Sequence, residues 1–296
     1  MTEFLQQLLN GLSLGAIYAL IALGYTMVYG VLRFINFAHS DVFMVGAFIG
    51  YYLGHILPEN TLWGGLLILL GAMLGCALLG MTIERLVYRP LRGGPTLNVL
   101  ITAIGMSLFL EYTGQLLFGA APRTFPSVFP SMNFQLGQLT ISSNQLVVIG
   151  VAFVLMIVLQ FIVFRTKIGT AMRAVSLNPK AAQLVGVNNN VVIAFTFAIG
   201  SALAGAGGIL YALNYPSIDP LMGVMPGLKA FVSAILGGIG NIPGAALGGL
   251  LLGTVETFVG GSQFSTYKDA IAFAILIVIL LFRPAGLLGK FTVEKV

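Results

Sequence analysis

The sequence predicts an all-α polytopic membrane protein. Of its 296 residues, 58% are hydrophobic and only 8% are charged, whereas charged residues make up about 25% of an average soluble domain. The mean hydropathy is +0.99. The chain contains about eight hydrophobic segments, most of them near the roughly 20 residues that a helix needs to cross the hydrocarbon core. These observations exclude a soluble protein.

Seven of the hydrophobic segments are expected to be simple spans. Their bounds are 8–31, 36–55, 61–83, 96–118, 144–164, 190–213 and 268–283. The first residues contain Glu3 and no Lys or Arg, so the positive region of a secretory signal peptide is missing and the first segment should remain as a span. We expect residues 1–296 to form a single transmembrane domain.

Lys and Arg residues cluster after the third, fifth and last spans, which predicts that these three loops are cytoplasmic. The clusters are Arg85, Arg89 and Arg92; Arg165, Lys167, Arg173 and Lys180; and Arg283, Lys290 and Lys295. Segment 119–143 carries one charged residue, Arg123, and is predicted to lie outside. Counting back from these loops places the N-terminus outside. The net charge of +5 therefore indicates topology and not nucleic-acid binding.

The Gly-rich segment 226–260 must begin and end on the outer side to keep this topology. Its centre, GGIGNIPG at 237–244, is typical of a turn, and both arms are short for full spans. It forms either a re-entrant or broken-helix hairpin, which we expect, or two full spans. Lys229 and Glu256 stand on opposite arms at comparable distances from the turn. Because ionised groups are costly within a membrane, we predict that they form a structural ion pair.

A second polar group lies at the start of the second span and within the fourth. It consists of Asn36, His39, Ser40 and Asp41 in the stretch NFAHSD, together with Glu111. The stretch is either a capped helix start, in which side chains satisfy free backbone N–H groups, or a polar gate on a solute path. Both interpretations remain open at this level.

The residues argue against an enzyme. A single cysteine, Cys76, excludes disulfides, and two histidines make a metal cluster improbable. No Walker A, HExxH or Ser-His-acid pattern occurs, and GGIGNIPG lacks the GxGxxG spacing. We expect this chain to bind no metal and no cofactor itself.

The stretch NPKAAQLVG, residues 178–186, predicts a short helix in the cytoplasmic loop 165–190. Asn178 is a good N-cap, Pro179 suits the first turn, Ala181 and Ala182 favour helix, and Gly186 ends it. A simple connector would not need this helix, since about two to eight residues can join two helices. The stretch is therefore predicted to form a short amphipathic helix held against the cytoplasmic face.

The spacing of Lys180, Ala181, Ala182 and Gly186 resembles the EAA signature of ABC importer permeases, with Lys180 where Glu is usual. Two further blocks are more specific: GLSLGAIYALIALGYTMVYGVLRFINFAHSD near the N-terminus and KAFVSAILGGIGNIPGAALGGLLLG at 229–253. With them the chain resembles, nearly end to end, permeases of the branched-chain amino acid type. Ser40 stands where that pattern leads us to expect Gly.

The resemblance implies a multi-pass permease of the bacterial inner membrane that pairs with a second homologous permease. Two cytoplasmic ATP-binding subunits would use ATP and dock on short coupling helices, and an extracytoplasmic binding protein would deliver the amino acid. On this interpretation 178–186 is the coupling helix, and Ala182 is expected to face the ATPase groove. Lipid is a partner, and nucleic acid is not.

Other functions are compatible with the same residues. One alternative is an importer of the same kind whose substrate is urea, an amide, a sugar or another small polar solute. Another alternative is a stand-alone secondary transporter or channel. Ion-coupled carriers usually carry many paired intramembrane charges, and this chain has few. A membrane scaffold without transport would leave Asp41 and Glu111 without a purpose.

Overall fold

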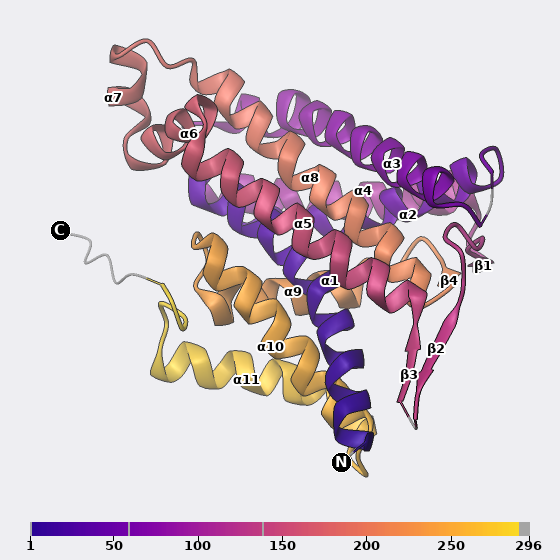
Figure 1. Ribbon diagram of the computed structural model, residues 1–296. Coiled ribbons are helices and arrows are strands. Elements are labelled where there is room, and N and C mark those ends of the chain that lie inside the picture. Colours follow the sequence, from indigo (N-terminus) through magenta and orange to yellow (C-terminus); the bar gives the residue numbers. More distant parts are fainter. Residues whose placement is uncertain (1, 59, 138, 290–296) are drawn as a thin grey trace.

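The computed structural model describes residues 2–58, 60–137 and 139–289 as a bundle of helices with short strands at one end (Figure 1). Lys290 and Lys295 of the predicted C-terminal cluster lie outside the described residues. The α-helices are α1 (Thr2–Leu32), α2 (His39–Gly54), α3 (Leu62–Ile83), α4 (Thr96–Phe118), α5 (Ser143–Arg165), α6 (Lys167–Leu177), α7 (Pro179–Leu184), α8 (Asn189–Asn214), α9 (Val224–Gly237), α10 (Ile242–Gly260) and α11 (Lys268–Phe282). A π-helix (Glu84–Tyr88) and a 3₁₀ turn (Arg89–Leu91) extend α3, and a 3₁₀ turn (Ser265–Tyr267) precedes α11.

Seven helical segments in the described part of the chain are long and apolar enough to cross a membrane. Six of them coincide with predicted simple spans. The predicted span 36–55 is not among them, because residues 37 and 38 form a turn and α2 begins only at His39 and has 16 residues. The seventh is α10, one arm of the Gly-rich hairpin. The fold is therefore the predicted all-α polytopic membrane protein.

The helices α1 and α8 form the centre of the bundle. In the most apolar stretch of each helix, 94% of α1 and 72% of α8 is buried, against 22% of α4 and 6% of α11. Helix α1 crosses α10 closely, because a Cβ added at Gly249 or Gly253 would collide with the α1 backbone at Ala19 or Gly15. Small residues thus allow the contact that membrane helices need when no hydrophobic force drives them together.

The Gly-rich hairpin consists of two unequal helices, α9 and α10. At 1.5 Å per residue, the 14 residues of α9 span roughly 21 Å and the 19 residues of α10 roughly 28 Å. The turn between them has positive φ at Gly238 (104°) and Gly240 (91°), and Asn241 caps α10 by accepting a hydrogen bond from the Gly244 N–H at 3.2 Å. Thus α9 is too short to be a full span, as expected for a broken-helix hairpin, while α10 has the length of a span.

The helix ends gather at two opposite ends of the bundle (Figure 1). We call the end with α6, α7 and residues 84–95, 238–241 and 283–289 the inner end. There Asn241 Nδ2 donates to the Leu288 carbonyl at 2.6 Å. We call the other end the outer end. There Gln6 Nε2 donates to the Thr140 carbonyl at 3.0 Å. The grouping of the loops agrees with the sidedness that the Lys and Arg clusters predict.

Two antiparallel strand pairs lie at the outer end. Strand β1 (Arg123–Thr124) pairs with β4 (Ser217–Ile218), and β2 (Asn133–Leu136) pairs with β3 (Leu139–Ser142). The register of the first pair sets Arg123 opposite Ile218. The β1–β4 pair fastens the predicted outside loop 119–143 to the loop that leads into α9.

Candidate functional site

Helix α7 begins and ends at the residues that the sequence indicates. Asn178 Oδ1 accepts from the Ala181 N–H at 3.0 Å, and Pro179 occupies the first turn. At the other end Gly186 has φ +87°, and the Val187 N–H donates to the Ala182 carbonyl at 3.0 Å. This 6→1 hydrogen bond behind a left-handed glycine is a Schellman-type ending. In contrast to the single predicted helix, the loop 165–190 holds two, because α6 precedes Asn178.

The expected outward orientation of Ala182 is wrong. Ala182 is 3% exposed and packs into the protein's own core. The exposed apolar residues are instead Leu184 at 90% and Val185 at 78%, with Leu177 nearby at 83%. A helix of six residues carries too little periodicity to show from sequence which face is buried.

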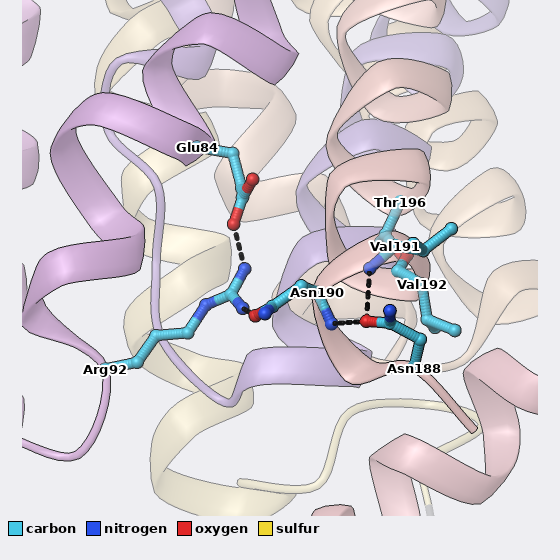
Figure 2. A network of polar contacts seen from close by, with 7 residues as sticks. All are labelled: Glu84, Arg92, Asn188, Asn190, Val191, Val192 and Thr196. Atoms are coloured by element: carbon cyan, nitrogen blue, oxygen red, sulfur yellow. Dashed lines mark hydrogen bonds and ion pairs between the residues drawn. The ribbon is translucent and has the colours of Figure 1, made fainter. Parts of the chain in front are cut away.

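A chain of polar contacts ties α7 to the inner ends of α3 and α8. Asn189 Nδ2 donates to the Pro179 carbonyl at 2.9 Å, and Arg92 Nη1 donates to Asn190 Oδ1 at 2.9 Å. Arg92 also forms an ion pair with Glu84, whose side chain is 1% exposed (Figure 2). The neighbouring Asn188 caps α8. Figure 2 shows Arg92 between the end of α3 and the first turn of α8.

Glu84 is buried although it lies at the end of a helix beside an Arg-rich loop. The π-helix that begins at Glu84 alters the turn spacing at the end of α3, and Glu84 and Tyr88 are both buried there. Burial lowers the pKa of the Arg92 guanidinium, and the charge of Glu84 opposes that shift. Because an Arg side chain keeps its proton in proteins, Arg92 still neutralises Glu84.

A cavity of about 670 Å³ lies between α7 and the ends of α1 and α3 at the inner end. Asn178, Pro179, Lys180 and Gln183 of α7 line one side. Three cationic side chains, Arg33, Arg92 and Lys180, also line it. The inner end thus presents a basic hollow beside an exposed apolar edge, an arrangement suited to a soluble partner with acidic and apolar groups.

The polar residues Asn36, His39, Ser40 and Asp41 of NFAHSD are buried, and none of them is the N-cap of α2. The N-cap is Ala38, and no described side chain makes a cap hydrogen bond to this helix. Asn36 Oδ1 accepts from the Tyr88 hydroxyl at 2.6 Å, and the His39 ring packs edge-on against Tyr25 with centroids 4.8 Å apart. The capped-start interpretation is therefore wrong, and the role in a solute path stays a prediction.

Asp41 and Glu111 lie near each other across α2 and α4. Asp41 is 1% exposed and accepts from the Ser107 hydroxyl at 2.5 Å; Glu111 follows Ser107 by one helical turn and is partly exposed. Among the described residues neither carboxylate forms a salt bridge. Ser40 packs against Gly223 and Gly227. A Cβ added at either glycine would collide with Ser40, so the two glycines allow this close contact.

Lys229 and Glu256 lie in contact, as the positions on the two arms predict. Lys229 Nζ is 2.6 Å from Glu256 Oε1. Two further residues, which the sequence did not single out, complete the cluster. Asp269 Oδ1 is also 2.6 Å from Lys229 Nζ, and the Tyr18 hydroxyl donates to Glu256 Oε2 at 2.9 Å. The available signal in the sequence was a charged residue in each of two apolar segments, at positions 256 and 269. Because the two residues belong to different helices, the sequence alone did not show that they meet.

The comparisons with known proteins point to one family. Residues 7–280 match the family described as branched-chain amino acid transport system, permease component. The chain is 44% identical to the high-affinity branched-chain amino acid transport system permease protein BraD of Pseudomonas aeruginosa, over 99% of this chain and 98% of that protein. It is 42% identical to LivH of Escherichia coli over the same shares, and 30% identical to a probable branched-chain amino acid permease of Methanocaldococcus jannaschii over 91% and 88%.

Proposed function

Because this chain belongs to the family of permease components of branched-chain amino acid transport systems, we propose that it works in an ATP-driven importer of the bacterial inner membrane. The chain itself is a multi-pass membrane permease subunit of a transporter complex and not an enzyme. In the proposed assembly it pairs with a second homologous permease. Two cytoplasmic ATP-binding subunits use ATP, and an extracytoplasmic binding protein delivers the amino acid at the outer end.

The hydrogen-bonded attachment of α7 to α3 and α8 is the observation that carries the ATP-driven mechanism. A force on α7 passes through Asn189 to α8, and through Asn190 and Arg92 to Glu84 at the end of α3. Because α8 is central to the bundle, a displacement of its first turn reaches the protein core. A loop that only connected two spans would not need these contacts.

The surface of α7 supports docking of a soluble subunit. Leu184 and Val185 expose most of their apolar side chains at the inner end, beside the basic hollow lined by Arg33 and Lys180. A contiguous apolar surface beside polar groups is typical of a protein interface. We therefore assign the ATP-binding subunit to this face, with its acidic groups toward the hollow.

The faces of α4, α5 and α11 that point away from the bundle support contact with the second permease and with lipid. Only 22%, 22% and 6% of their most apolar stretches are buried within this chain. In a membrane such faces are covered by acyl chains or by another helix. The alternatives of a urea or amide permease and of a stand-alone carrier are not favoured by the relatives, which are named as branched-chain amino acid permeases.

Substitution of Leu184 tests the docking assignment. Leu184→Glu places a charge on the proposed interface, so recovery of the co-produced ATP-binding subunit in a pull-down should fall roughly five- to thirtyfold, since an interface anchor contributes about 1–2 kcal/mol. The matched control is Ile56→Glu, which adds the same charge at a 78% exposed apolar residue of the outer end. Equal recovery from both variants would contradict docking on α7.

A further inference from the structure

The cluster around Lys229 contains more charge than a structural ion pair requires. Lys229 is 5% and Glu256 7% exposed, and each already neutralises the other. Asp269 adds a second carboxylate at 2.6 Å from Lys229 Nζ, although its own side chain is 40% exposed. Buried ion pairs often contribute no more to stability than apolar side chains of similar volume. Helix packing alone therefore does not explain why three charged residues meet here.

A cavity of about 180 Å³ lies beside this cluster. Its wall carries the charged residues Lys229, Glu256, Lys268 and Asp269, so that it holds two positive and two negative groups. The cavity is half-open and not enclosed, so a solute can reach it from the surroundings. A cavity of about 150 Å³ holds one benzene molecule, so this one has room for a ligand of about six carbon atoms.

The rest of the wall is aromatic and aliphatic. Tyr18, Tyr211 and Tyr215 contribute rings from α1 and the end of α8, and Leu14 and Met225 contribute aliphatic groups. The Tyr18 hydroxyl is engaged by Glu256 at 2.9 Å, which fixes that carboxylate. Small-molecule sites commonly combine such an apolar wall with a few convergent polar groups that orient the ligand.

We propose that this cavity binds an apolar α-amino acid in its zwitterionic form, an inference that rests on the proposed function and adds a substrate site to it. The ammonium group pairs with Asp269, the exposed carboxylate of the cluster, and the carboxylate group pairs with Lys268. The aliphatic side chain lies against the tyrosine rings. A neutral sugar or urea would leave these opposite charges unmatched, so the site selects against both.

The position of the cavity suits a solute that arrives from outside. It lies at the outer end, between the second half of α8, the first turns of α9 and α11, and the last turns of α10. The first turn of α9 also contacts the buried polar stretch, because Gly227 packs against Ser40. Helix α9 therefore connects the proposed binding site to the predicted polar path at the start of α2.

Equilibrium binding of radiolabelled leucine to the purified permease complex, without binding protein, tests the site. Wild type should bind leucine, and Asp269→Asn should weaken binding at least tenfold because the ammonium loses its carboxylate. Binding of 4-methylpentanoate, which lacks the ammonium group, should be equal in the two proteins. Lys268→Ala should weaken the binding of both leucine and 4-methylpentanoate, because both ligands carry the carboxylate group. Asp219→Asn is the matched control, since Asp219 lies in the same outer loop region outside this cavity.

The outcomes separate this site from the proposed function. Size-exclusion chromatography confirms that each variant is folded; Asp269→Asn leaves the Lys229–Glu256 pair intact, and Lys268 is exposed. If wild type binds no leucine, or if both variants bind like wild type while the complete transporter still takes up leucine, the site is wrong and the function stands. Absence of leucine uptake by the complete wild-type transporter would instead contradict the function.

Discussion

At the scale of single residues, Lys229 holds the centre of a charge cluster that joins four helices. It contacts Glu256 of α10 and Asp269 of α11, and Tyr18 of α1 bonds to Glu256. Loss of Lys229 leaves two carboxylates without their cation, whereas loss of the Glu256 charge leaves Lys229 paired with Asp269. The two partners are therefore not equivalent.

We predict that Lys229→Met destabilises the protein more than Glu256→Gln. Removal of one partner of a fully buried pair costs about 3–5 kcal/mol, and only Lys229→Met orphans a buried carboxylate. The double variant should recover part of the folded yield, and adding Asp269→Asn should recover more. Thermal unfolding of the detergent-purified variants checks the order. Additive losses in the double variant would show that the pair is not coupled.

The inner network allows a second prediction. Arg92→Gln removes the cation beside the buried Glu84, so it should lower the melting temperature and impair coupling. Glu84→Gln combined with Arg92→Gln should be more stable than Arg92→Gln alone, because no charge is then orphaned. The control is Arg85→Gln, an exposed arginine of the same segment. If the Arg85 and Arg92 variants melt alike, the ion pair does not stabilise the inner end.

The residue pairs differ in how far sequence predicts them. Lys229 and Glu256 lie at similar distances from one turn, so a local hairpin brings them together and their contact follows from spacing. The contact of Glu84 with Arg92 depends on the π-helix at the end of α3, and that of Lys229 with Asp269 on how α11 packs. Neither of these has a local signal, because tertiary packing decides it.

At the scale of elements, helix bounds followed from composition far better than helix orientation did. The cap at Asn178 and the glycine at 186 fix both ends of α7, since each acts through its own backbone. The direction in which the Ala182 side chain points depends on how α7 packs against the bundle, and the sequence prediction of that direction was wrong. Likewise the hairpin at 226–260 was predictable from its glycines, but not the unequal lengths of α9 and α10.

Gly186 provides the test of α7 as a coupling element. Its φ of +87° is unfavourable for a β-branched residue by roughly 1–2 kcal/mol or more. Gly186→Val should therefore loosen the end of α7 and reduce ATP-driven uptake while leaving the permease inserted. Gly186→Asn is the matched control, because Asn tolerates a left-handed backbone. Uptake and ATP hydrolysis by the reconstituted complex measure the effect; equal uptake by both variants would contradict the role of the helix end.

At the scale of the whole molecule, the two ends of the bundle should lie on opposite sides of the membrane. In a Cys76→Ala background, cysteines at Gly94 and Gln183 report the inner end and a cysteine at Gln263 reports the outer end; all three positions are exposed. A membrane-impermeant thiol reagent applied to intact spheroplasts should label only position 263. Labelling at 94 or 183 would reverse the predicted orientation.

Transport itself tests the central claim, that this permease moves branched-chain amino acids by the work of ATP-binding subunits docked on α7. The measurement is leucine accumulation in proteoliposomes that contain the complete complex, with binding protein outside and ATP enclosed. We predict accumulation with ATP, none with ADP, and strongly reduced accumulation with Leu184→Glu. Leucine accumulation by the permease alone, driven by an ion gradient and unaffected by ATP, would contradict the account and favour a secondary transporter.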